Sequence, residues 1–338
     1  MLYICKHSDT DRNSRMSGPR KVLITGANGF IGAPLMARYR EAGIDVVGID
    51  LSGDPANNVR VGDIRKPEAW EVHLRDVDLV VHTAAIVTLS GDPDLFWSTN
   101  VLGTQKVVEA AVKHGVKRIV HLSSVTVFGF DFPDGVDETY PVRPNGAQYV
   151  DTKIASEQVV LEAHAAGDIE GVILRPGDVY GPRSEAWTLT PIEYIRTGRM
   201  ILPNKGEGIL SPIYVDNVVD AIVAAGERGA AAGQVFTITN GVGIRARSFF
   251  RRYCDIMRVG PPRTAPYRLL RPAVGVVGFV DRLRGQPGHF EPRTIDYMMR
   301  TGTYSIAKAR EILDFEPRVD LDEGFKRTAR WLVKEGIV

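Results

Sequence analysis

The chain has 338 residues, a formal net charge of +1 and two cysteines. This near balance of charge argues against a nucleic-acid partner, and no apolar run is long enough to cross a membrane. Because Cys5 and Cys254 lack metal-ligand spacing, we expect no metal site, no disulfide framework and a cytoplasmic location.

Residues 1–20 are polar and lack the apolar core of a secretory signal, so we expect a flexible extension in which Met16 is an alternative start. The apolar run 22–25 then predicts a buried strand. It leads into a turn with three glycines and an amphipathic segment at 33–42.

Each glycine of this turn has a separate expected task. Gly26 permits the tight turn, Gly29 lets backbone N–H groups approach a phosphate, and Gly32 lets the helix lie close to the strand. The helix N-terminus offers unpaired N–H groups to a pyrophosphate. The next strand, 44–49, ends at Asp50, near the spacing of an acid that binds an adenosine ribose. The alternative is a glycine-rich turn with an incidental aspartate.

Predicted strands and helices continue to alternate as far as residue 174. We predict further strands at 59–64, 78–83, 116–124 and 169–174, and helices at 67–75, 98–115 and 149–166. Six strands alternating with helices predict an α/β fold with a Rossmann-type, doubly wound parallel sheet.

Beyond residue 175 the alternation of strands and helices becomes irregular. Helices are expected at 191–198, 217–227, 305–313 and 321–334, with short strands in 201–215 and one at 234–239. We therefore expect three parts: the extension 1–20, a dinucleotide-binding domain at 21–175, and a mainly substrate-binding lobe at 176–338. Some segments of the lobe should return to the first domain.

Two side chains at the start of the 149–166 helix are candidates for proton transfer. Tyr149 and Lys153 are four residues apart and so share a helix face. A neighbouring ammonium favours a phenolate, and lowering a phenol pKa by about three units requires about 4 kcal/mol. Ser123 or Ser124, at the end of the fifth strand, could hold a substrate oxygen. The alternatives are an exposed surface pair and a strand-end cap.

Together these motifs resemble the extended short-chain dehydrogenases/reductases. The resemblance covers residue 21 to the end and rests on these segments: Thr25-Gly26-Ala27-Asn28-Gly29-Phe30-Ile31-Gly32, Gly62-Asp63-Ile64, His82-Thr83-Ala84-Ala85, Asn100, Ser123-Ser124, Tyr149 with Lys153, Arg175-Pro176, Tyr180-Gly181-Pro182, Tyr214-Val215-Asp216-Asn217-Val218 and Tyr304-Ser305-Ile306-Ala307-Lys308-Ala309.

The resemblance implies NAD as cofactor and a catalytic set of Ser124, Tyr149 and Lys153. Ser124 would orient the reacting oxygen, Tyr149 would transfer the proton, and Lys153 would hold the ribose and lower the tyrosine pKa. The implied cofactor-binding residues are Gly26, Asn28, Gly29, Phe30, Ile31, Gly32, Asp50, Asp63, Ile64, Thr83, Ala84, Ala85, Asn100, Tyr149, Lys153 and Pro176. Because no arginine directly follows Asp50, NAD is favoured over NADP.

Three branches of the family share these motifs. Dehydratases carry an acid pair where this chain has Val125-Thr126, which argues against dehydration. Sugar-nucleotide epimerases typically carry an asparagine near the diphosphate where this chain has Asp178, a charge that Arg183 and Arg245 could compensate. The 3β-hydroxysteroid dehydrogenase branch fits the segment 175–182 better.

The sequence therefore favours an NAD-dependent oxidoreductase that acts on a secondary alcohol or ketone of a hydrophobic substrate. A UDP-sugar 4-epimerase is the main alternative, and a non-catalytic NAD-binding redox sensor is another. The apolar run 273–280 fits a core helix or strand, a lid or a peripheral membrane contact. The resemblance also implies a homodimer. The helix residues Val107, Val108, Ala111, Val159 and Val160 could form its face, and the alternative is that they pack on the sheet.

A further set of side chains has a structural interpretation. His82 and His121 should pack as neutral rings in strands, Met298 and Met299 should belong to the core, and Arg245, Arg247, Arg251 and Arg252 should form a solvated helix face.

Overall fold

The computed structural model describes residues 18–88, 91–283 and 292–338. Nearly all of the expected extension 1–20 lies outside these residues. No helix in the described parts of the chain has the length and hydropathy to cross a membrane.

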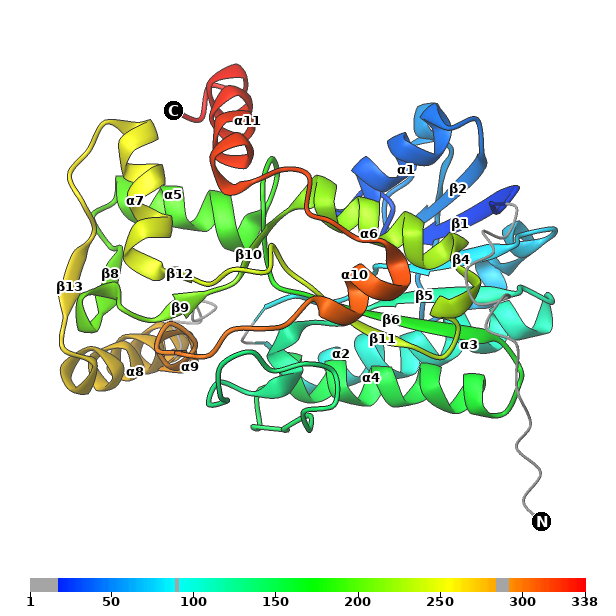
Figure 1. The fold of residues 1–338 in the computed structure, drawn as a ribbon, viewed down its shortest axis with the longest axis horizontal. Coiled ribbons are helices and arrows are strands. Elements are labelled where there is room, and N and C mark those ends of the chain that lie inside the picture. The colour runs from blue at the N-terminus through cyan, green and yellow to red at the C-terminus, as the bar shows by residue number, and fades with distance from the viewer. Residues whose placement is uncertain (1–17, 89–90, 284–291) are drawn as a thin grey trace, which may run out of the picture.

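A seven-stranded, wholly parallel sheet forms the centre of the molecule (Figure 1). Leu23 is flanked by Val47 on one side and Val80 on the other, and all three are buried, as expected for a sheet covered on both faces. The order of the strands across the sheet is β11 (Val235–Ile238), β6 (Glu170–Pro176), β5 (Arg118–Leu122), β4 (Leu79–His82), β1 (Lys21–Thr25), β2 (Asp45–Asp50) and β3 (Val59–Val61). The predicted doubly wound α/β fold is confirmed.

Helices cover both faces of this sheet. The helices α1 (Gly32–Glu41) and α6 (Val215–Glu227) lie on one face, and α3 (Gly103–Lys113) and α4 (Gln148–Ala165) on the other. The core between these two helices and the sheet contains Val107, Val108 and Ala111 of α3 and Val160 of α4. These four side chains therefore pack against their own sheet, which is one of the two alternatives that the sequence leaves open, and they do not form a dimer face.

Two predicted helices differ from the structure by more than two residues at an end or in type, whereas the others agree within two residues at each end. The segment 67–75 forms two 3₁₀ turns, Pro67–Ala69 and Glu71–Leu74, because the fully buried Trp70 between them donates its indole N–H to the Asp63 carbonyl at 2.8 Å. The helix predicted from residue 98 begins earlier, with α2 (Pro93–Phe96), where Asp92 caps the backbone N–H of Asp94. It continues through a π-helical turn, Trp97–Leu102, into α3.

The second half of the chain forms a lobe beside the sheet (Figure 1). It contains α5 (Thr190–Arg196), α7 (Ala246–Met257), α8 (Tyr267–Leu283) and α9 (Pro292–Tyr297). Three short ladders join β10 (Pro212–Tyr214) to β7 (Asp178–Tyr180), β12 (Ile244–Arg245) to β9 (Ile209–Leu210), and β13 (Arg263–Ala265) to β8 (Ile201–Pro203). Three segments of this half return to the sheet: α6 covers one of its faces, β11 pairs with β6, and α10 (Ala307–Leu313) packs beside β11.

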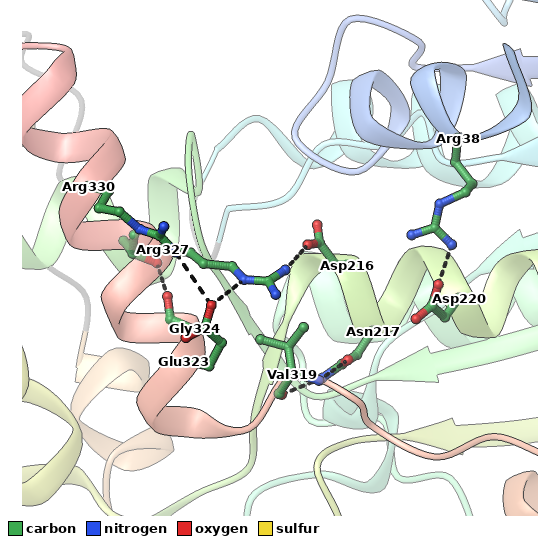
Figure 2. A network of polar contacts seen from close by, with 10 residues as sticks. Arg38, Asp216, Asn217, Asp220, Val319, Glu323, Gly324, Arg327 and Arg330 are labelled. Atoms are coloured by element: carbon green, nitrogen blue, oxygen red, sulfur yellow. Dashed lines mark hydrogen bonds and ion pairs between the residues drawn. The ribbon is translucent and has the colours of Figure 1, made fainter. Parts of the chain in front are cut away.

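The last helix, α11 (Leu321–Lys334), is tied to α6 by polar contacts (Figure 2). Arg327 binds Asp216 at 3.0 Å and Glu323 at 2.8 Å. The Asn217 side chain donates to the Val319 carbonyl at 2.8 Å and accepts from its N–H at 2.9 Å. These contacts fix the lobe against the helix layer of the sheet.

Candidate active site

The glycine turn lies between β1 and α1. Gly26 has a φ of +71°, and a Cβ there would come within 2.9 Å of the Ala84 backbone. A Cβ on Gly32 would lie 2.1 Å from the Gly26 carbonyl oxygen. The turn and the start of the helix can therefore be this tight only because both positions lack side chains.

Asp50 and Arg183 both contact the residue at the centre of this turn. The backbone N–H of Asn28 donates to Asp50 Oδ2 at 3.0 Å, and its carbonyl accepts from Arg183 Nη2 at 3.1 Å. The carboxylate at the end of β2 is thus placed at the turn, as expected for a ribose-binding acid. Arg183 contributes a contact from the other half of the chain.

The other proposed cofactor residues follow β3 and β4. Asp63 forms an ion pair with Arg65 at 2.6 Å, and hydrogen bonds from Arg65 hold its pKa below the usual range. Ile64 is buried in the core. Thr83 donates from its hydroxyl to the Thr25 carbonyl at 2.7 Å, which places Ala84 against the glycine turn.

Asn100 is engaged by protein groups. Its side chain accepts from the Ile86 N–H at 2.8 Å and donates to the Ile86 carbonyl and the Thr152 hydroxyl, each at 3.1 Å. It is buried, with 2% exposure. Asn100 therefore holds the loop after β4 against α4. Its partner in α4, Thr152, directly precedes Lys153.

Ser124 and Tyr149 meet at the carboxyl end of β5. Ser124 begins the 3₁₀ turn Val125–Phe128, and its Oγ accepts from the Thr126 N–H at 3.2 Å. Burial raises the pKa of Tyr149 to about 12, although a hydrogen bond from Ser124 acts in the opposite direction. Burial outweighs this hydrogen bond, so the net shift of the Tyr149 pKa in the structure is upward. The lowering of this pKa by Lys153 stays a prediction.

Lys153 lies one turn along α4 and donates from Nζ to the Leu122 carbonyl at 2.6 Å. It is 4% exposed, and burial lowers its pKa to about 8. An ammonium at this position is costly in the folded protein.

This shift predicts a dependence of stability on pH. Between pH 8 and pH 10 the unfolded chain keeps the Lys153 proton, which the folded protein has lost. The free energy of unfolding of the wild type should therefore rise relative to that of Lys153→Met by about 1.4 kcal/mol per pH unit, about 2 kcal/mol over this window. Urea unfolding of both proteins across the window measures the difference. A difference that stays constant with pH would contradict the shift.

A buried ion pair beneath the site was not predicted from the sequence. Glu157, one turn after Lys153, is fully buried and binds Arg175 through two hydrogen bonds of 2.8 and 2.7 Å. Its charge acts to raise the pKa of Lys153, against the effect of burial. The spacing of Lys153 and Glu157 along the helix was the available signal.

The two strand histidines are packed as expected. His82 lies between the Thr25 and Thr104 hydroxyls, at 2.7 and 3.0 Å, and its ring stacks on His121. Burial lowers the pKa of His82 to about 3 and that of His121 well below its usual value. Both rings are therefore neutral supports of the sheet.

Asp178, the residue that separated the two branches, is fully buried in β7. One oxygen accepts from the Tyr297 hydroxyl, and the other accepts from the Ser211 N–H at 2.7 Å and pairs with Arg300 at 3.0 Å. The expectation that Arg183 and Arg245 compensate this charge is wrong. Arg183 reaches Asn28, and Arg245 pairs with Glu207 at 3.2 Å.

The geometry of the turn fits a dinucleotide. Because Gly26 and Gly32 lack side chains, the backbone closes into a tight turn directly before the start of α1, and Asp50 lies beside this turn. Gly26, Gly29 and Gly32 would admit the pyrophosphate, and Asp50 would bind the ribose. No group of three or more potential metal ligands occurs among the residues that the structure describes.

Comparison with known proteins gives the family. The model of the NAD dependent epimerase/dehydratase family matches residues 22–239. The mouse sterol-4-alpha-carboxylate 3-dehydrogenase, decarboxylating, is 26% identical over 95% of this chain and 93% of its own. The UDP-glucose 4-epimerase of Mycolicibacterium smegmatis is 30% identical over 92% of this chain and 98% of its own.

A solved structure shares the fold over nearly the whole length. The UDP-glucose 4-epimerase of Thermotoga maritima, solved with UDP-glucose, superposes with a TM-score of 0.77 at 25% identity, covering 93% of this chain and 99% of its own. Both comparisons extend across the sheet and the lobe. The chain therefore belongs to the NAD dependent epimerase/dehydratase family and is an NAD-dependent enzyme of the extended short-chain dehydrogenase/reductase type.

Proposed function

We propose that this enzyme is an oxidoreductase of the 3β-hydroxysteroid dehydrogenase type, acting on a secondary alcohol or ketone of a hydrophobic substrate. The buried state of Asp178 carries the proposal. Both of its oxygens are occupied, and its partner Arg300 is only 1% exposed. Neither side chain is available to the diphosphate of a sugar nucleotide.

Aromatic side chains in the chain after Ser124 support an apolar substrate. The half-buried ring of Phe130 meets Tyr297 edge-on at 5.3 Å, and the half-buried Trp187 lies 5.8 Å from the same tyrosine. These rings join the segment that follows the proposed catalytic serine to the lobe. The sterol dehydrogenase among the relatives is consistent with this substrate class.

The chain's own residues would divide the reaction as follows. Tyr149 takes the proton of the alcohol as it is oxidised, or returns it to the oxygen of a ketone. The Ser124 hydroxyl, already directed at Tyr149, holds that oxygen, and the Lys153 ammonium favours the phenolate. NAD, when bound, supplies the hydride acceptor or donor.

Epimerisation of a UDP-sugar remains the second candidate, because the M. smegmatis epimerase aligns over 92% of this chain. A turnover screen separates the two. The purified enzyme is given NAD with 3β-hydroxysteroids or apolar secondary alcohols, and NADH is measured. UDP-glucose is assayed separately by product analysis, since epimerisation releases no net NADH. We expect NADH with the apolar alcohols and no epimer; UDP-galactose as the product would overturn the proposal.

Asp50 should set the preference for NAD over NADP. The variant Asp50→Ala should lower the ratio of kcat/KM for NAD to that for NADP by about tenfold, since a hydrogen bond to a charged group contributes about 1.5–3 kcal/mol. Asp45→Ala, an exposed acid at the other end of β2, is the matched control and should leave the ratio unchanged. If both variants keep the wild-type ratio, Asp50 does not bind the ribose.

We also propose that the protein is a homodimer. The dimer interface must be formed by exposed residues, because four of the candidate side chains are buried in the protomer: Val107, Val108, Ala111 and Val160. Light scattering of the purified protein measures the mass, and a monomer at all concentrations would contradict the proposal.

A further inference from the structure

Helix α8 is held to the lobe by one face only. Leu270 is 8% exposed on that face. Asp296 of α9 accepts hydrogen bonds from the Tyr267 hydroxyl at 2.8 Å and from Arg271 at 2.7 Å. The helix therefore has a defined inner side and a fixed orientation.

The opposite face of α8 is apolar and exposed. Leu269 is 67% exposed, Val276 63%, Val277 48% and Phe279 58%, and the exposed Pro272 and Ala273 lie between them. The spacing of 269, 272, 273 and 276 places these residues on one stripe of the helix. A continuous apolar stripe of this kind marks an interaction surface. Within the apolar run 273–280, Ala273, Val276, Val277 and Phe279 are therefore outside the core.

The surroundings of this stripe are basic. Residues 258–279 include four arginines and no aspartate or glutamate. Arg263 and Arg268 are exposed and form no ion pair with any residue between 18 and 338 that the structure describes. Figure 1 shows α8 at the end of the lobe, remote from the sheet.

We propose that α8 docks on the surface of an anionic lipid bilayer, with its apolar face in the interface and Arg263 and Arg268 at the headgroups. An apolar stripe flanked by cations is the pattern of helices that lie in a membrane surface. A second copy of the chain fits less well, because a two-fold interface would set Arg263 and Arg268, which have no acidic partner among the described residues, against their own copies. Docking through α8 does not require the substrate class proposed above.

Vesicle binding tests the proposal. The full-length protein is sedimented with vesicles of phosphatidylcholine and phosphatidylglycerol in equal parts, and with pure phosphatidylcholine. Val276→Glu and Phe279→Glu should each lower partitioning into the anionic vesicles by at least about tenfold, because each removes the apolar contact. Removing an arginine, as in Arg263→Gln or Arg268→Gln, should lower it about fivefold.

Val333→Glu is the matched control, since Val333 of α11 is 64% exposed and lies on another helix. It should bind vesicles like the wild type, and all variants should bind NAD equally. Absence of binding to anionic vesicles, or equal loss in the control, would overturn the proposal. So would a wild-type dimer that Val276→Glu converts to monomer, which would identify a second copy as the occupant.

Discussion

The variant Tyr149→Phe should lose turnover by a factor of about 10² to 10⁴, the contribution of a positioned acid or base. The substitution removes only the hydroxyl that Ser124 contacts, so the half-buried ring can stay in place. Steady-state kinetics with the substrate found in the screen measures the loss. NAD affinity, measured by calorimetry, should remain within a few fold of the wild type.

Tyr140→Phe is a suitable control because Tyr140 is also half-buried and packs against Phe128, in the turn that Ser124 begins. It should retain nearly full activity. A Tyr149→Phe enzyme with a wild-type rate would remove Tyr149 from the mechanism. Equal losses in both variants would show that packing near the 3₁₀ turn, and not proton transfer, limits the rate.

The variant Arg300→Met should lower the free energy of unfolding by about 3–5 kcal/mol, because it leaves the Asp178 carboxylate buried without its counter-ion. Urea unfolding followed by circular dichroism measures this loss. In the double variant Arg300→Met/Asp178→Leu the uncompensated charge is gone, so much of the stability should return. If the double variant is no more stable than the single one, lost packing and not the buried charge explains the effect.

Arg327→Met provides the comparison for an exposed ion pair (Figure 2). Arg327 is 40% exposed and binds Asp216 and Glu323, both also partly exposed. Its loss should cost at most about 1 kcal/mol, because water replaces the missing partner.

Local patterns predicted most of the sheet and of its helices. The conformation of the glycine turn at 26–32 could be predicted from the sequence, because the positive φ of Gly26 and the close packing of Gly32 both require the absence of a side chain. The predicted helix 321–334 agrees with α11 in both bounds. The prediction was wrong where a tertiary contact decides the conformation, as at Trp70, whose burial divides a helical pattern into two short turns.

In the candidate site, too, local spacing predicted some features, and tertiary contacts decided others. Tyr149 and Lys153 share a helix face, so their proximity follows from spacing alone. The partner of Asp178 could not be found this way, because Arg300 lies 122 residues further along the chain. The effect of burial on the Tyr149 pKa could not be found this way either, since burial depends on packing that spacing does not reveal. The roles of the proposed site residues stay predictions until the variants are measured.

The edge strand β11 links the second half of the chain to the central sheet and limits how that half can be replaced. It comes from the second half of the chain, yet its backbone pairs with β6 from Val235 to Ile238. A chain cut after residue 175 would leave β6 as an open edge, which invites pairing with other molecules. The second half of the chain therefore cannot be exchanged as one contiguous segment without also replacing an edge strand of the sheet. Substitution in place leaves this edge paired.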